Sequence, residues 1–212
     1  MSVYVSTDIL RPFNIAADPR RFLYSDSSLA PLNLTLPMLQ RILTYHQVMP
    51  AYLDFISVFQ AQLFERDVRF SGFQEQIGFS SRTSSPAMPN LGRSGLQYQL
   101  CYNLKMVKVL QPESHNPMPN RWPMRQAAFH HQFDVKYGTA LWISTKVQLD
   151  DLKIRTKELT GKDGRLEDHD YTSTVACFKS TLPVHLMYCH LAAEGWRWYI
   201  RHLEDLVDHK VM

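Results

Sequence analysis

Histidine is the residue type with which this chain is best supplied for chemistry. The sequence has nine histidines, and the ordinary pKa of imidazole lies close enough to neutral for acid–base work and for binding metals. His130 and His131 are adjacent on an expected strand and so point to opposite faces, which prevents them from holding one ion together. His185 and Cys189 lie four residues apart on an expected helix. That spacing suits a metal pair, although most such pairs are packing neighbours.

An acid–base pair is the sharper hypothesis for these histidines. Under it, His131, His185 or His190 acts as the general base, and Asp134 or Glu194 orients it. His190 and Glu194 are also four residues apart, and a hydrogen bond on a helix surface is the plainer interpretation of that spacing. The hypothesis requires at least two of these side chains to converge in a mostly apolar pocket.

A cluster of carboxylates offers a second kind of chemistry. Oxygen ligands suit hard divalent cations, so this acidic stretch predicts weak binding of a cation such as Mg²⁺. The alternative is solvated capping of the helix that follows, because the helix dipole favours carboxylates there whatever they bind. The candidate ligands are Asp163, Glu167, Asp168 and Asp170.

Several functional classes are disfavoured by what the chain does not contain. It has no GxGxxG, GxxxxGK[ST], HExxH, GxSxG or EF-hand motif. The charge balance of 23 basic to 20 acidic residues is too even to indicate nucleic-acid binding. The three cysteines show no CxxC spacing, no secretory signal is visible, and no apolar run reaches the roughly 20 residues of a membrane span. We therefore expect a cytoplasmic protein that does not itself cross a membrane.

The elements that must position these residues follow from periodicity. Residues 35–49 and 50–63 predict two consecutive amphipathic helices laid on a sheet, the first capped by Thr35. Residues 68–79, 100–109, 129–135 and 140–144 predict extended segments, the last two joined as an antiparallel hairpin at Gly138. A further helix is expected over 149–161. The expected fold class is α+β, or mixed α/β: a central, largely antiparallel sheet flanked by helices, with a long C-terminal helix.

The 212 residues predict one domain, with an irregular N-terminal segment over 1–30, a flexible loop over 80–97 and a C-terminal helical region over 170–209. No heptad series longer than three turns is apparent. Trp196 and Trp198 diverge by about 200° on a helix, so only one of them can face the core. We expect Trp198, with Arg197 and Arg201, to contact a partner, and the C-terminal helix to support a homo-oligomer.

Three stretches resemble the fungal CorA-like proteins. They are WPMRQAAFHHQFDVKYGTALWISTK, LPVHLMYCHLAAEGWRWYIRHLEDLV and NLTLPMLQRILTYHQVMPAYLDFISVF, and the similarity extends over residues 32–207. The resemblance implies a soluble α/β domain of the magnesium-transporter type, whose last helix becomes a stalk leading to the membrane. Transporting members need two transmembrane helices and a Gly-Met-Asn motif, and neither is present in the sequence. We therefore do not expect the chain to form the pore.

Two functions follow as hypotheses. The first is a soluble CorA-like module without a pore that binds a ligand or divalent cation, regulates or assembles. The second is a small-molecule enzyme recruited from such a domain, working through the histidines and carboxylates named above. The non-catalytic module is the first hypothesis and the enzyme the alternative, and a fragment of a longer transporter is a third interpretation.

Overall fold

A five-stranded sheet forms the centre of the molecule. The structure is a computed structural model that describes residues 20–25, 32–58, 71–79, 85–107, 122–147, 154–155, 158–159 and 172–211. The strand order is β1-β5-β4-β3-β2; β2 to β5 pair antiparallel, and β1 adds a parallel strand at the edge beside β5. The strands are β1 (Arg20–Ser25), β2 (Phe73–Gly78), β3 (Gln97–Val107), β4 (Met124–Asp134) and β5 (Ala140–Val147).

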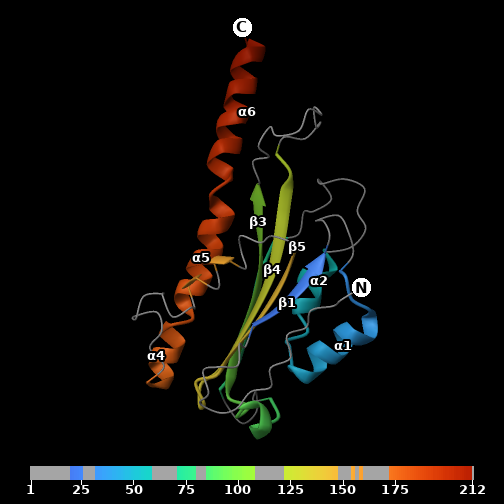
Figure 1. Ribbon diagram of the computed structural model, residues 1–212, viewed down its shortest axis with the longest axis vertical. Coiled ribbons are helices and arrows are strands. Elements are labelled where there is room, and N and C mark those ends of the chain that lie inside the picture. Colours follow the sequence, from blue (N-terminus) through green and yellow to red (C-terminus); the bar gives the residue numbers. More distant parts are fainter. Residues whose placement is uncertain are drawn as a thin grey trace.

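Helices lie on both faces of this sheet (Figure 1). One face carries α1 (Leu36–Tyr45) and α2 (Tyr52–Ser57), and the other carries α4 (Thr174–Lys179), α5 (Leu182–Ala193) and α6 (Trp196–Val211). The helix α6 continues α5 in nearly the same direction and extends past the end of the sheet (Figure 1). This arrangement confirms the predicted α+β class, with a largely antiparallel sheet flanked by helices and a long last helix.

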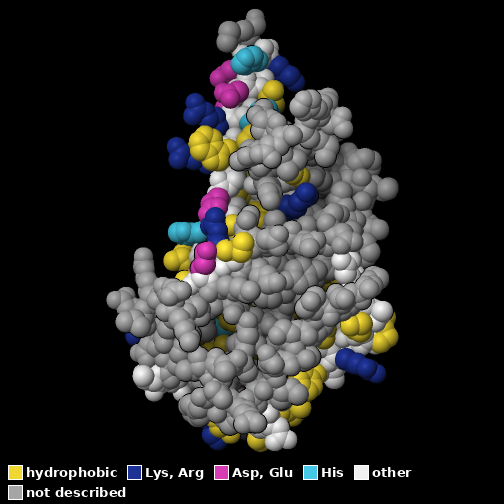
Figure 2. Space-filling view, in the orientation of Figure 1, with side chains coloured by type: hydrophobic (Ala, Val, Ile, Leu, Met, Phe, Trp, Pro, Cys, Tyr) yellow, Lys and Arg dark blue, Asp and Glu magenta, His cyan; other side chains and the backbone are white. Residues whose placement is uncertain are grey.

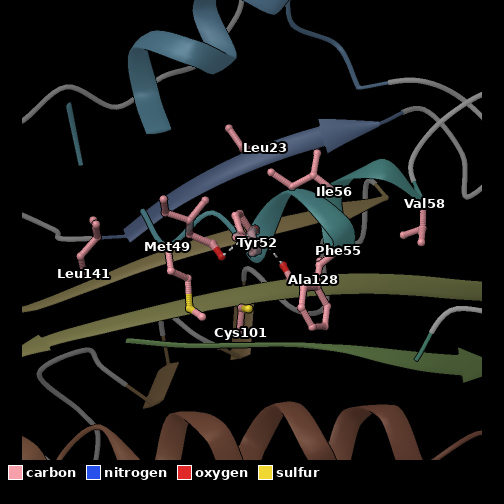
Figure 3. Packing of buried hydrophobic residues seen from close by; sticks show 10 residues of the cluster. Leu23, Met49, Tyr52, Phe55, Ile56, Val58, Cys101, Ala128 and Leu141 are labelled. Atoms are coloured by element: carbon pink, nitrogen blue, oxygen red, sulfur yellow. Dashed lines mark hydrogen bonds between the residues drawn. The ribbon is translucent and has the colours of Figure 1, made fainter. Parts of the chain in front are cut away.

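The sheet face beneath α2 is closed by an apolar core that is centred on Tyr52 (Figure 3). The Tyr52 hydroxyl lies 2.9 Å from the Thr145 hydroxyl and within 3.4 Å of the Ala128 carbonyl oxygen. Burial raises the pKa of this phenol, so the hydroxyl stays protonated and keeps its donor. Phe55 and Ile56 pack beside it from the same helix. This packing fixes β4 and β5 from the side that is opposite to α5.

The hairpin between β4 and β5 forms where the sequence predicts it. Gly138 has φ +67°, a conformation that glycine adopts without strain. Asp134 fixes the turn because its carboxylate accepts hydrogen bonds from the backbone N–H groups of Lys136 and Tyr137, at 3.0 and 2.9 Å. The same carboxylate accepts from the Ser94 backbone N–H and hydroxyl. The turn is therefore tied to the segment that precedes β3.

Two of the segments expected to be irregular contain regular structure. Arg20–Ser25 forms β1 within the stretch expected to be irregular over 1–30, because β5 offers it a free edge to pair with. Within the loop expected over 80–97, Met88 and Arg93 form a β-bridge around the 3₁₀ turn Pro89–Leu91, and Gln97 begins β3. The helix expected over 149–161 is helical at 154–155 and 158–159, and its other residues lie outside the described ones.

The junction between α5 and α6 is held against the end of β3. A Cβ atom on Gly195 would lie 1.7 Å from the Val107 carbonyl oxygen, so only glycine allows this approach. The Trp196 indole N–H donates to the Lys105 carbonyl at 3.0 Å. These two contacts set the point at which α6 leaves the sheet.

Candidate functional site

The structure brings two of the predicted histidines together between the sheet and α5. Successive residues of β4 alternate between the faces, so His130 points toward α2 and His131 toward α5, as predicted. The Nδ1 atom of His131 lies 3.0 Å from Nε2 of His185. A strand and a helix that are 54 residues apart in the sequence thus meet through two imidazoles.

Aromatic side chains enclose this pair. The His131 ring stacks on Trp142, its partner in β5, with 4.1 Å between ring centroids and 11° between planes. The Tyr102 hydroxyl lies 2.8 Å from Nδ1 of His185, and the Tyr98 hydroxyl lies 3.2 Å from Nδ1 of His131. We call these five residues the histidine cluster. Each is on a strand or helix of the core, so the scaffold holds their geometry.

Burial keeps both imidazoles neutral. Loss of hydration lowers the pKa of His185 to about 4, and it lowers that of His131 well below its ordinary value, an effect that the neighbouring His185 reinforces. Burial raises the pKa of Tyr98 to about 12 and that of Tyr102 further still. The cluster is therefore a chain of neutral hydrogen-bonding groups at physiological pH.

The neutrality of these histidines predicts how stability depends on pH. His130, whose pKa burial lowers to about 3, adds a third such group on the other sheet face. Unfolded histidines bind protons below about pH 6.5 and these folded ones do not, so stability falls as the pH drops from 6.5. At pH 5 we expect a loss of about 2 kcal/mol for each of His130 and His185, from 1.36 kcal/mol per pH unit, and a further loss in the same direction from His131.

Urea unfolding between pH 7 and pH 5 measures this loss, in a range above the titration of most carboxylates. Replacing His185 with Gln should reduce the loss of unfolding free energy between pH 7 and pH 5 by the amount that one histidine contributes. Replacing the exposed His190 with Gln serves as the control and should leave the dependence unchanged. A free energy of unfolding that stays constant from pH 7 to pH 5 would contradict the claim that these histidines are neutral in the folded chain.

The other members of the predicted acid–base set lie elsewhere. Asp134 is buried at the hairpin turn, where its carboxylate accepts hydrogen bonds from Ser94, Lys136 and Tyr137. Glu194 is exposed at the end of α5 and forms an ion pair with Arg155. His190 is exposed on α5. Tyr102 and Tyr98, which the sequence did not single out, occupy the places beside the histidines instead.

No metal centre is formed by the described part of the chain. There, no group of three or more His, Cys, Asp or Glu side chains is placed to hold an ion. His185 is turned to the sheet, whereas Cys189 is exposed, so this predicted pair is divided between two surfaces. The four predicted acidic ligands, Asp163, Glu167, Asp168 and Asp170, lie outside the described residues, and Mg²⁺ binding by them stays a prediction.

A second polar network lies on the sheet face beneath α2. Gln99 accepts a hydrogen bond from the Met49 backbone N–H at 2.8 Å, and its amide oxygen also lies 2.9 Å from Nε2 of His130. The guanidinium of Arg93 is buried and lies 3.0 Å from Nδ1 of His46. The sequence did not indicate these residues, because polar residues on a strand usually face solvent. They hold the connection after α1 onto the sheet.

A row of apolar residues with heptad spacing extends along α5 and α6 and includes Trp196, whose indole contacts β3. Their positions alternate by four and three residues, as in the seam of a coiled coil. Five of them are between 41% and 60% exposed, Cys189 and Ala193 are also exposed, and only Trp196 is partly buried. We call it the heptad row; it comprises Leu182, Leu186, Cys189, Ala193, Trp196, Ile200, Leu203 and Val207.

The two tryptophans of α6 diverge as predicted. Trp196 is partly buried against β3, whereas Trp198 is 52% exposed. The guanidinium carbon of Arg197 lies 5.7 Å from the centroid of the Trp198 ring. Two residues of helix separate their directions by about 200°, so Trp198 lies on the side of α6 away from the heptad row. Figure 2 shows the projecting part of α6 with apolar, basic and acidic side chains exposed together. Binding of a partner by Trp198, Arg197 and Arg201 stays a prediction.

Comparison with known proteins gives one match. A family model described as CorA-like transporters matches residues 13–212. No curated protein and no solved structure matches the chain. Within the described residues, every helix is too short or too polar to cross a membrane.

Proposed function

Because the chain belongs to the family of CorA-like transporters, a family related to divalent cations, we propose that it acts there as an assembly module. In this role α5 and α6 pair with the same helices of a second copy. The module is regulatory rather than pore-forming. A ligand or divalent cation regulates it by binding at a site that does not include the heptad row. The observation that carries the proposal is the heptad row itself.

The heptad row fits a helical partner in both length and composition. It extends over 26 residues, or about 39 Å at 1.5 Å per residue. Full burial of a Leu, Ile or Val side chain is worth roughly 1.5–3 kcal/mol, and these side chains, about half exposed, forgo about half of that each. A row with alternating spacing of three and four buries these side chains against another row of the same kind. A second copy of the chain supplies such a row.

The inner face of α5 explains why the partner comes from outside. Val184, Tyr188 and Ala192 already pack on the sheet, in one cluster with Phe129 and Trp142. The helix α5 is therefore apolar on both sides, a pattern typical of a helix that is covered all round. The sheet covers one side, and the partner copy covers the other.

An enzyme is the second candidate function, and one observation favours it. His131 and His185 converge, as the acid–base hypothesis requires, although tyrosines rather than carboxylates accompany them. The pair joins the sheet to the helix that carries half of the heptad row. The two histidines could regulate assembly by binding a ligand, without catalysing any reaction. We therefore rank the assembly module above the enzyme.

Thiol cross-linking tests the proposed pairing in the unmodified chain. Cys101 is buried, Cys177 is half-buried and Cys189 is exposed in the heptad row, so a short bismaleimide should react first at Cys189. Parallel pairing places the two Cys189 thiols across the seam and yields a covalent dimer. Antiparallel pairing instead places Cys189 opposite Ile200, so the dimer forms only after Ile200→Cys.

The control for this experiment is Cys189→Ser, which should remove the product. Failure of both the native chain and Ile200→Cys to cross-link would reject the pairing. Repeating the reaction with and without millimolar Mg²⁺ tests whether a divalent cation affects the pairing. An unchanged yield of cross-linked dimer would reject that part of the proposal.

A further inference from the structure

One hydrogen-bonding atom of the histidine cluster has no partner. The Nε2 atom of His131 is buried and is without a hydrogen bond in the described part of the chain. Buried polar groups are nearly always paired, because an unpaired one forfeits about 1–3 kcal/mol. A group that forms a hydrogen bond with this atom would recover that free energy.

The neighbouring hydrogen bonds determine which hydrogens this atom carries. The neutral Tyr102 hydroxyl lies within hydrogen-bond distance of Nδ1 of His185, and donating to it satisfies both atoms. The neutral His185 then carries its hydrogen on Nε2, from which it donates to Nδ1 of His131. His131 in turn carries its hydrogen on Nε2, so the unpaired atom is an N–H donor.

The reverse direction of the chain is less favourable. If His131 donated from Nδ1, His185 would donate to the Tyr102 oxygen, and the Tyr102 hydrogen would be left without an acceptor. The lone pair on Nε2 of His131 would also stay unpaired. The reverse direction therefore leaves one more group unsatisfied than the first, and in the first the Tyr98 hydroxyl shares the single lone pair on Nδ1 of His131 with His185. The hydrogen bonds therefore run from Tyr102 through His185 to His131.

The surroundings restrict what can accept this hydrogen bond. Among the described residues, His131 and His185 contact the uncharged aromatic side chains of Tyr98, Tyr102 and Trp142. An anion brought there would lose its hydration without meeting a positive charge, which is costly. An uncharged carbonyl oxygen accepts the hydrogen bond without that cost.

We propose that the histidine cluster binds a small, uncharged, flat carbonyl compound, whose oxygen accepts the Nε2–H of His131. A hydrogen bond from Nε2 lies in the plane of the imidazole, which is stacked parallel to Trp142. A flat ligand in that plane extends along the indole and adds an aromatic contact. The site is formed within one copy of the chain, so it stands independently of assembly through the heptad row.

Benzamide and benzoate are matched probes for this site, since they differ mainly in charge. With ¹⁵N-labelled histidine, NMR at pH 7.5 should show His131 protonated at Nε2, its signal identified by its loss in His131→Gln. Benzamide should shift this signal saturably and bind at least about 10-fold more tightly than benzoate, a difference of about 1.4 kcal/mol. The control His190→Gln should leave benzamide binding unchanged.

Three results would overturn the proposal. The first is an Nε2 atom that carries no hydrogen, the second is a His131 signal that benzamide does not shift, and the third is tighter binding of benzoate. The tautomer is read from the unsubstituted chain, so the test holds even where a variant at His131 does not fold.

Discussion

The double substitution Leu186→Glu and Leu203→Glu is expected to abolish self-association while leaving the fold intact. Both side chains are exposed in the single chain, at 58% and 41%, so the substitutions should change its stability by no more than about 0.5 kcal/mol each. In a paired heptad row each glutamate would be buried without a counter-charge, at a cost of several kcal/mol. Association should weaken on the order of 1,000-fold or more, which sedimentation velocity would detect.

Trp198→Glu is the matched control for that result. It makes the same chemical change at a residue that is also about half exposed on α6, but on the side away from the heptad row. We expect this variant to associate as the unsubstituted chain does. Equal loss of association in both variants would mean that general surface hydrophobicity, rather than the heptad row, holds the copies together.

Gly195→Ala is expected to cause the largest loss of stability of any single methyl addition to the described glycines of this chain. The new Cβ would lie 1.7 Å from the Val107 carbonyl oxygen and 2.8 Å from its carbon, and both atoms belong to the backbone of β3. Either the α5–α6 junction or the end of β3 must move. We expect a loss of about 3 kcal/mol, at the upper end of overpacking effects, measurable by urea unfolding.

Gly195 lies in the turn between α5 and α6, where the gain of about 1 kcal/mol that alanine has over glycine within a helix does not apply in full. Ala193→Gly, two residues earlier at an exposed site, isolates that effect and should cost about 1 kcal/mol. A Gly195→Ala variant as stable as the unsubstituted chain would show that the junction is not packed as described.

Local patterns in the sequence predicted the features that depend on local geometry. The opposite directions of His130 and His131 follow from the two-residue period of a strand, and Gly138 marks a turn because its backbone conformation favours glycine. Thr35 caps α1 as predicted, accepting a hydrogen bond from the Met38 backbone N–H. Each of these features is determined within a few residues of chain.

Features made by distant segments could not be predicted in this way. The strand β1 is regular because it pairs in parallel with β5, more than one hundred residues later, and its own sequence shows no clear alternation. The contact between His131 and His185 likewise depends on α5 lying across β4. The sequence named both histidines and paired them with carboxylates, whereas the hydroxyl groups that lie beside them in the structure belong to Tyr102 and Tyr98.

The composition of α5 and α6 kept the heptad row from being recognised in the sequence. Because α5 is apolar on its inner and outer sides, no single amphipathic stripe stands out from the sequence. Cys189, Ala193 and Trp196 are also unusual members of a coiled-coil seam, which Leu, Ile and Val normally dominate. The expectation of no heptad series beyond three turns was therefore wrong. In the folded chain, the exposed residues of the heptad row can be distinguished from the buried residues of α5 that lie between them in the sequence.

The helix α5 connects the two sites of this account. Its inner face places His185 against His131, and its outer face carries Leu182, Leu186, Cys189 and Ala193. A ligand that strengthens the contact between α5 and the sheet would also fix the direction of the heptad row. Binding at the histidine cluster and pairing of the helices thus have a common structural element.

The molar mass of the unsubstituted chain in solution tests the central claim most directly. Light scattering across a range of protein concentrations should give a mass that rises from one chain toward a whole-number multiple of it, and Leu186→Glu with Leu203→Glu should hold it at one. A mass of one chain at every concentration for the unsubstituted protein would contradict the claim that the heptad row is an interface between copies.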